Sequence, residues 1–244
     1  MGYMSTSFVS VEMITQGGTL LASSNLKCRF ELLKPKAVAS AGGQLVIVPG
    51  SEPVTPRLVH VELANLRDDD KTAARFLWAH GPLLVEEKYR LSNTGAQGYL
   101  VGPVAEAINP LLETYPNADF YLHTRELLME RSWLLRHAWD GNRNAVSTLE
   151  QYLDSATGLH FQKGSICITA RSAWTVAVIM FLYDYSRNRI ARCENPDCPA
   201  PYFIRKRNTQ KFCEAGPCAD YGARQRAKRW WKEFGNDWRK GRKA

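Results

Sequence analysis

Apolar and polar residues alternate along three stretches of the first 66 residues, and a period of two is typical of β-strands with one buried face. The three stretches are 9–13, 28–32 and 59–63. The turn-forming dipeptides in this region are Gly17–Gly18, Gly42–Gly43 and Pro49–Gly50. Residues 1–66 are therefore predicted to form a small antiparallel β region.

Helical spacing replaces this alternation from residue 67 onward. The run 71–80 follows three aspartates at 68–70, one of which can cap a helix, and Gly81 ends it. Further helices are predicted at 104–112, 119–140, 144–153 and 170–185. The last of these is apolar on nearly all sides, which places it at the centre of a helical core. We expect residues 67–190 to form a mainly helical domain, either alone or as one domain with residues 1–66.

Charge is distributed unevenly along the chain. Residues 186–244 hold 16 Lys or Arg against six Asp or Glu, whereas the first 185 residues hold 16 against 18. The whole chain, at 45% hydrophobic and 23% charged, has the composition of an ordinary soluble globular protein. Its longest apolar stretch is about half a membrane span, and its N-terminus lacks a cationic start before an apolar core. We expect a cytoplasmic protein with no membrane partner and with a basic C-terminal segment.

Four of the six cysteines fall within 26 positions and form two pairs of equal spacing. They are Cys193, Cys198, Cys213 and Cys218. Each pair encloses turn-forming residues, so each can bend around a metal ion. Four thiolates favour one structural Zn(II) per chain over an iron–sulfur cluster, and two disulfides would not suit a reducing compartment. Four sulfur ligands leave no open position for water, so catalysis at the ion is not expected.

The residues around these cysteines predict three further elements. An aromatic strand at 202–204 and a polar turn at 205–211 that returns at Phe212 indicate a β-hairpin, and a helix at 219–234 begins just after Cys218. Knuckle, hairpin and then a helix that carries the last ligand is the order of a treble-clef zinc finger, which we place at residues 191–244. The predicted fold class is α+β, with a small antiparallel β region, a central mainly helical domain and a treble-clef-like four-cysteine finger.

This arrangement resembles the bacterial CGNR-type zinc finger proteins, in which a helical N-terminal domain, often labelled ABATE, precedes a four-cysteine finger and a basic helix. The likeness lies in the apolar helix that leads to Cys193, the aromatic strand after Cys198, and Cys218 at the start of a basic helix. The triplet that gives the family its name is replaced by residues 219–221. The resemblance implies a transcriptional regulator that binds DNA, and it suggests a small-molecule effector for the N-terminal region.

Nine cations of the finger are predicted to meet the phosphates of nucleic acid, with DNA favoured over RNA. They are Arg205, Lys206, Arg207 and Lys211 on the hairpin and Arg224, Arg226, Lys228, Arg229 and Lys232 on the helix. Trp230 and Phe234 are expected to pack the helix against the hairpin or the N-terminal domain, which leaves Trp231 or Trp238 to contact a partner. The alternative is a zinc-stabilised protein-interaction module with no affinity for nucleic acid.

Nothing in the sequence points to an enzyme. The five histidines are scattered, and the HExxH, GxSxG, GxGxxG and P-loop patterns do not occur. We therefore expect no enzymatic activity. The nucleic-acid sequence that is bound, the identity of an effector and the oligomeric state are not encoded in any pattern that can be read here.

Overall fold

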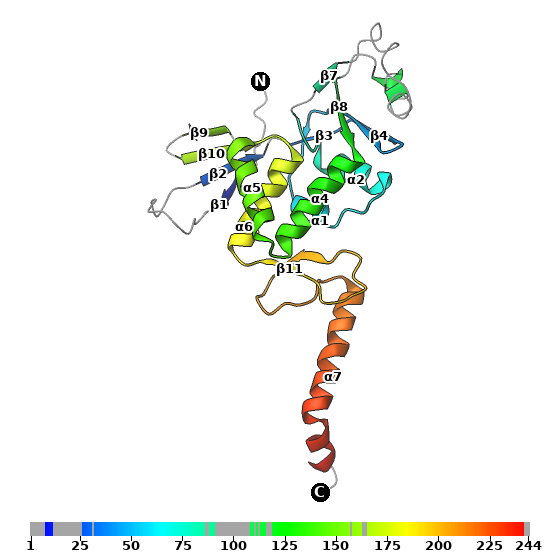
Figure 1. Ribbon diagram of the computed structural model, residues 1–244, viewed down its shortest axis with the longest axis vertical. Coiled ribbons are helices and arrows are strands. Elements are labelled where there is room, and N and C mark those ends of the chain that lie inside the picture. Colours follow the sequence, from blue (N-terminus) through cyan, green and yellow to red (C-terminus); the bar gives the residue numbers. More distant parts are fainter. Residues whose placement is uncertain are drawn as a thin grey trace. The chain divides into compact units, whose positions relative to one another are not determined.

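The structure is a computed structural model that divides the chain into two compact units, residues 1–187 and residues 188–244. Figure 1 shows the elements of both units. The residues that the structure describes are 8–11, 26–30, 32–85, 88–90, 108–109, 111, 113–115, 119–156, 158–162 and 165–241. The fold class is α+β, as predicted. In these ranges no helix is both long enough and apolar enough to cross a membrane.

Two four-stranded sheets form much of the first unit. The first has the order β1 (Phe8–Val11), β2 (Leu26–Phe30), β10 (Ser165–Ala170) and β9 (Gly158–Gln162), and only its β2–β10 pair is parallel. The second is antiparallel, with the order β4 (Ala37–Ala41), β5 (Gln44–Val48), β8 (Asp119–Thr124) and β7 (Lys88–Arg90). Strands from residues 1–66 thus pair with strands that come much later in the chain.

Two shorter features accompany these sheets. A two-stranded ladder joins β3 (Leu33–Lys34) to β6 (Glu52–Pro53). The turn between β4 and β5 is made by Gly42 and Gly43, both with positive φ angles of 54° and 82°. A two-residue hairpin turn needs this left-handed backbone, and glycine adopts it without steric cost. The predicted turn at Gly42–Gly43 is confirmed, whereas the one at Gly17–Gly18 lies outside the described residues.

The helices of the first unit surround a core centred on α6, as predicted. The described helices are α1 (Val59–Ala64), α2 (Asp70–His80), α4 (Arg125–Trp139), α5 (Arg143–Ala156) and α6 (Ala173–Ser186). Figure 1 shows α1, α4, α5 and α6 side by side, in agreement with their contacts. Ten of the 14 residues of α6 are buried. It begins at residue 173 rather than 170, because β10 takes the preceding residues and Ser172 caps the helix by accepting from Thr175 N at 3.1 Å.

The boundaries of α2 agree with the sequence. Asp69 is the N-cap and accepts a hydrogen bond from Thr72 N at 2.7 Å, and Gly81 ends the helix with a φ of 82°. The side chain of Thr72, and then its backbone N–H, lower the pKa of Asp69 by hydrogen bonding. Both ends depend on residues within a few positions of each other, which is why local sequence predicts them.

The strand predicted at 59–63 is wrong, because these residues form α1. Val59, His60, Leu63 and Ala64 are buried, and the spacing of these four positions places them on one face of a helix. His60 Nε2 lies 3.1 Å from Asp184 Oδ2 of α6. Packing against α4 and α6 therefore selects the helix over the strand that alternation suggests.

The single helix predicted at 119–140 is also wrong in its first part. Residues 119–124 form β8, between β5 and β7, and Phe120 of this strand is fully buried. The helix α4 begins at Arg125, where the Thr124 side chain accepts from Leu127 N at 3.1 Å. Of the helix predicted at 104–112, Ile108, Asn109 and Leu111 are helical and the rest lies outside the described residues.

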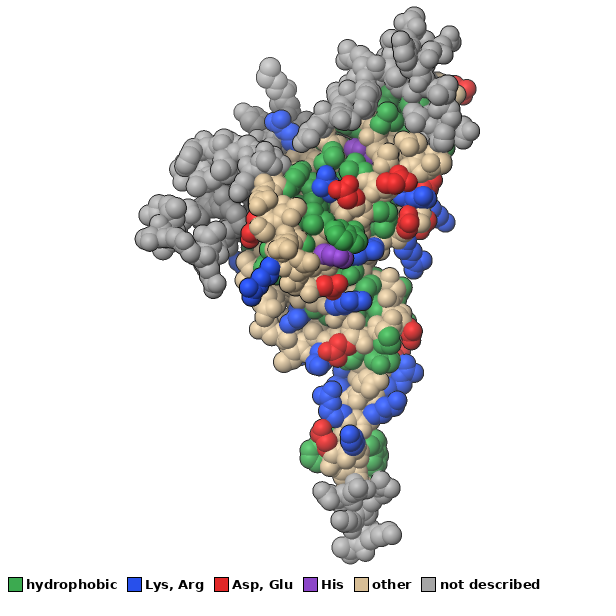
Figure 2. Space-filling view, viewed as in Figure 1, with side chains coloured by type: hydrophobic (Ala, Val, Ile, Leu, Met, Phe, Trp, Pro, Cys, Tyr) green, Lys and Arg blue, Asp and Glu red, His purple; other side chains and the backbone are tan. Residues whose placement is uncertain are grey.

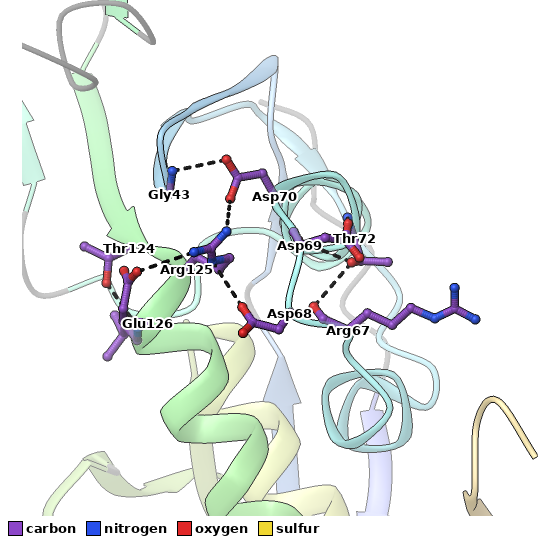
Figure 3. Close-up of polar contacts among 10 residues, drawn as sticks. Gly43, Arg67, Asp68, Asp69, Asp70, Thr72, Thr124, Arg125 and Glu126 are labelled. Carbon is purple, nitrogen blue, oxygen red and sulfur yellow. Dashed lines mark hydrogen bonds and ion pairs between the residues drawn. The ribbon is translucent and has the colours of Figure 1, made fainter.

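A polar network joins the β4–β5 turn to the starts of α2 and α4 (Figure 3). Arg125 Nε lies 3.1 Å from Asp68 Oδ1, and Arg125 Nη1 donates to Asp70 Oδ1 at 3.2 Å. The other oxygen of Asp70 accepts from Gly43 N at 3.1 Å, and Arg125 N donates to Gly43 O at 2.8 Å. The aspartates at 68–70 therefore serve the fold, as caps and as partners of one arginine.

The second unit contains two strands and one long helix. Strand β11 (Ile190–Arg192) pairs antiparallel with β12 (Tyr202–Ile204), and α7 runs over Gly216–Gly241. The predicted strand 202–204 is confirmed, but its predicted return at Phe212 is wrong, because its partner precedes the first cysteine. The predicted helix 219–234 is confirmed and extends beyond 234, with Pro217 in its first turn.

Candidate metal centre

The four cysteines of the second unit converge at the start of α7. Cys193 follows β11, Cys198 closes the turn that leads to β12, and Cys213 and Cys218 flank the first turn of the helix. Their four Sγ atoms all lie within 4.8 Å of one another. No second group of three or more Cys, His, Asp or Glu with this arrangement occurs in the ranges that the structure describes.

The spacing of the sulfur atoms fits a single ion. Cys198 Sγ and Cys213 Sγ lie 3.7 Å apart, and all four cysteines are free. A disulfide would bring two sulfurs to about 2.05 Å. A tetrahedral ion with metal–sulfur bonds of about 2.3 Å sets its ligands ~3.8 Å apart. Four thiols at this spacing can therefore hold one metal ion, and they are not paired as cystines.

Two N–H groups are directed at the sulfurs and fix their positions. The Asn195 amide Nδ2 donates to Cys218 Sγ at 3.2 Å, and Cys213 N donates to Cys193 Sγ at 3.4 Å. Asn195 is buried, and its Oδ1 accepts from Asp197 N at 3.3 Å. Hydrogen bonds of this kind orient ligands and stabilise the thiolate form that binds metal.

The sulfurs differ in how readily they lose their protons. Burial raises the pKa of the Cys198 thiol and, likewise, that of Cys213. The Asn195 amide is the main cause that lowers the pKa of Cys218. Neighbouring thiolates repel one another, which opposes deprotonation of the thiols. A bound divalent cation offsets this repulsion and so favours the thiolate forms.

The core of the second unit consists largely of the ligands themselves. Its buried cluster contains Ala191, Phe203, Cys193 and Cys218, with the other two cysteines and Phe212 packed against it. Phe212 also packs closely against α7: a Cβ atom added at Gly222 of the helix would lie 2.7 Å from the Phe212 ring. So small an apolar cluster cannot hold the unit together by itself, so we expect its folding to be coupled to metal binding.

The predicted nucleic-acid contacts fall into two groups that differ in their partners. In the loop after β12, Lys206 Nζ donates to Glu214 at 2.7 Å and Lys211 Nζ donates to Glu194 at 3.0 Å. Arg205 Nη1 donates to the backbone oxygen of Asn208 at 3.4 Å. These ion pairs are exposed and weak, but they place two of the predicted cations beside acids.

The five cations of α7 that were predicted to contact nucleic acid have no such partners. All five are exposed, and none takes part in an ion pair within the part of the chain that the structure describes; they are Arg224, Arg226, Lys228, Arg229 and Lys232. Figure 2 shows Lys and Arg side chains gathered along this helix. The described part of α7 is therefore a long helix with a net positive charge, and it begins at the candidate metal centre.

Four aromatic residues of α7 are exposed, which corrects the prediction that Trp230 and Phe234 pack against the hairpin. Packing against the N-terminal domain stays a prediction. Trp230 is 42% exposed and Phe234 is 53% exposed, and Trp231 and Trp238 are exposed to a similar degree. Their ring contacts are with one another. The sequence shows their spacing, but it does not show whether another element covers that face.

Three of the five histidines occupy structural positions in the first unit. His60 pairs with Asp184, His80 Nε2 lies 2.8 Å from Glu62 Oε2, and His123 Nε2 accepts from Leu83 N at 3.1 Å. These buried polar pairs were not evident in the sequence, because their partners lie between 18 and 124 positions away. Asn195 was also missed as a donor to sulfur, although its place inside the first cysteine pair is a signal that could have identified it.

No family model, no curated protein and no solved structure matches the chain. The resemblance to the CGNR-type proteins thus stays a prediction from the sequence. What the chain does has to be argued from the geometry and charge of its own residues.

Proposed function

We propose that residues 188–244 form a structural zinc finger of the treble-clef kind, whose basic helix binds nucleic acid, DNA in preference to RNA, in a transcriptional regulator related to the CGNR type. The observation that carries this proposal is the convergence of four Sγ atoms within 4.8 Å at the first turn of α7. A metal ion bound there would fix the first turn of the basic helix α7 to the rest of the unit.

Zinc suits this site better than other metals. Soft thiolate ligands in a closed tetrahedral set favour Zn(II), and four sulfurs within 4.8 Å leave room for one ion rather than for a cluster of iron and sulfide. The ion is structural, because four protein sulfurs fill its coordination sphere. The order of a knuckle between β11 and β12, followed by ligands at the start of a helix, supports the treble-clef interpretation.

The charge of this part of the chain supports a polyanionic partner. Residues 186–244 carry a formal charge of +10, and four thiolates with one Zn(II) lower it to +8. Lysine and arginine side chains bind phosphates chiefly by releasing the counterions condensed on nucleic acid, so the affinity falls steeply with salt. The unpaired cations of α7 are available for this without first breaking an ion pair.

The proposal is tested first by metal content and then by binding to duplex DNA. Elemental analysis should find one zinc per chain. Fluorescence anisotropy should show binding at low salt and a linear fall of log affinity with log salt concentration. Replacing Arg224, Arg226 and Lys228 together by glutamine should reduce that slope by about one per lost phosphate contact. The matched control replaces Lys206 and Lys211 by glutamine, which should reduce the slope less.

Two results would contradict the proposal: a chain without bound zinc, or no salt-dependent binding to DNA at low salt. A zinc-loaded chain that binds no nucleic acid would favour the protein-interaction module instead. A small-molecule effector of the first unit stays a prediction from the resemblance. Thermal-shift measurements with metabolites on the full chain would test it.

A further inference from the structure

One face of α7 is exposed and carries mostly apolar side chains. At 3.6 residues per turn its apolar members fall within a sector of about 120°, and positions Asp220 and Asp237 fall within the same sector. The apolar members are Ala219, Ala223, Ala227, Trp230, Trp231, Phe234 and Trp238, which we call the aromatic stripe. Large aromatic side chains gathered on an exposed surface mark a place where something binds.

The aromatic stripe lies on the opposite side of the helix from the finger. Phe212 approaches the helix at Gly222 and forms an edge contact with Tyr221 at 5.7 Å between ring centroids. Positions 221 and 222 are more than about 100° around the helix from the centre of the stripe. The finger therefore holds α7 by one side and leaves the stripe facing away from it.

The rings of the aromatic stripe present their faces in different directions. Trp230 and Trp231 meet nearly at right angles, at 84° with centroids 5.0 Å apart, and Trp231 meets Trp238 at 88°. Trp231 lies against the backbone at Gly235, where a Cβ would come within 2.6 Å of its ring. Edge-to-face contacts hold these rings in place without stacking them on one another, which preserves flat surfaces for a ligand.

Cations border the aromatic stripe on both sides. Arg226 lies beyond the Trp230 edge, with the exposed Glu233 next to it, and Arg224 and Lys228 lie beyond the Trp231 edge. The three cations are exposed and have no ion pair among the described residues. A second copy of this helix would bring the same charges into contact, so electrostatics oppose self-association through the stripe. The bordering cations instead complement a ligand that carries regular negative charge.

The composition of the aromatic stripe separates two anionic partners. The helix contains no Leu, Ile, Val or Met, and the apolar side chains of the stripe are alanine or aromatic. A helix in a coiled coil relies on branched aliphatic side chains. A helix that lies in a membrane interface can use Trp and Phe, but the exposed Asp220 lies in the same sector as the aromatic stripe and would have to enter the apolar boundary of the bilayer. Flat rings bordered by arginine and lysine are the surface that proteins use to stack unpaired bases while binding the phosphates between them.

We propose that α7 binds DNA with unpaired bases, which stack on Trp230, Trp231 and Phe234 while Arg224, Arg226 and Lys228 contact the phosphates. This inference rests on the proposed function and narrows its ligand from DNA in general to DNA with unpaired bases. Every base has a flat face, so binding depends on strandedness more than on base sequence.

The experiment compares labelled oligo(dT) with a duplex of the same length, using the full zinc-loaded chain at matched salt. Oligo(dT) should bind more tightly than the duplex and quench tryptophan fluorescence. In the double variant Trp230→Leu/Trp231→Leu, which keeps apolar side chains and all charges, affinity for oligo(dT) should fall at least about tenfold while affinity for the duplex is kept. Trp133→Leu is the matched control, because Trp133 is 55% exposed on α4 and should not affect binding.

The possible failures are distinguishable. If the duplex binds but oligo(dT) binds no more tightly, or the double leucine variant behaves as the parent, the stacking inference is overturned and the proposed function stands. If neither ligand binds, the stacking inference and the proposed function are both overturned. Anionic phosphatidylglycerol vesicles provide a further arm. Vesicle binding that is lost in the double variant while oligo(dT) binding is unchanged would assign the aromatic stripe to lipid and overturn the inference.

Discussion

At the scale of single residues, Asn195 connects the fold of the finger to its metal chemistry. Its buried amide donates to Cys218 Sγ, and its own oxygen accepts from Asp197 N. The first bond lowers the pKa of Cys218, and the second holds the turn that carries Cys198. One side chain thus stabilises a thiolate from one cysteine pair while it shapes the loop of the other pair.

Asn195→Ala should weaken zinc binding by about 10- to 100-fold, because Cys218 loses the donor that stabilises its thiolate. Competition with a chromophoric chelator measures this change. Asn208→Ala is the control: the contact of Asn208 with Arg205 uses its backbone oxygen, which the variant keeps, so affinity should be unchanged. Equal affinities for the two variants would contradict this role of Asn195.

Zinc affinity should rise with pH. Burial raises the pKa of Cys198 and of Cys213, so both thiols keep their protons at neutral pH without metal. An incoming ion displaces these two protons, and a lower pH opposes that displacement. We expect apparent affinity to fall by at least about 100-fold for each unit of pH lost below neutrality. Chelator competition between pH 6 and 8 measures the slope, and an affinity independent of pH would show that these protons are not displaced.

At the scale of elements, α1 shows how tertiary contacts stabilise a segment that cannot be stable alone. Six residues are too few for an independent helix. Arg136 of α4 donates from Nε to Ala64 O at 2.7 Å and from Nη2 to Leu66 O, and so satisfies carbonyl groups at the end of α1. The packing of α1 against α4 and α6 completes its stabilisation.

Arg136→Leu should lower the free energy of unfolding of the first unit by about 2 kcal/mol, because two carbonyl groups lose a charged donor. Urea unfolding followed by circular dichroism measures the loss. Arg75→Leu on the exposed side of α2 is the control, with an expected change within about 0.5 kcal/mol. If the free energy of unfolding falls no more than in the control, water satisfies the two carbonyl groups as well as Arg136 does.

At the scale of the whole molecule, the two units have cores of different kinds. The first buries large apolar side chains, among them Trp174, Phe120 and Phe181. The second has a buried cluster in which the metal ligands are the main components. Hydrophobic burial stabilises the first unit, whereas under the proposed function the second unit requires a bound zinc ion to fold.

Removing zinc with a strong chelator should therefore unfold residues 188–244 and leave residues 1–187 folded. Structural zinc contributes on the order of 10 kcal/mol in small metal-dependent domains. Hydrogen exchange read by mass spectrometry should show lost protection in β11, β12 and the start of α7, with α6 still protected. Cys198→Ser should reproduce the effect without a chelator. Protection lost from both units together would show that they depend on each other.

Local sequence was sufficient for the features whose cause is local. The caps of α2 at Asp69 and Gly81, the turn at Gly42–Gly43 and the start of α7 near Pro217 each depend on residues a few positions apart. The cysteines belong to the same class, since all four lie within 26 positions and their spacing restricts which sulfurs can meet. The charge of the basic segment is likewise a property of composition.

Tertiary structure decided what depends on distant partners. Residues 59–63 alternate like a strand but form a helix, because α4 and α6 bury one side of it, and residues 119–124 form a strand because β5 and β7 flank them. The partner of β12, the ion pairs of Lys206 and Lys211, and the exposure of the aromatic stripe follow the same rule. Periodicity records which residues share a face of an element, whereas the packing of the chain determines what covers that face.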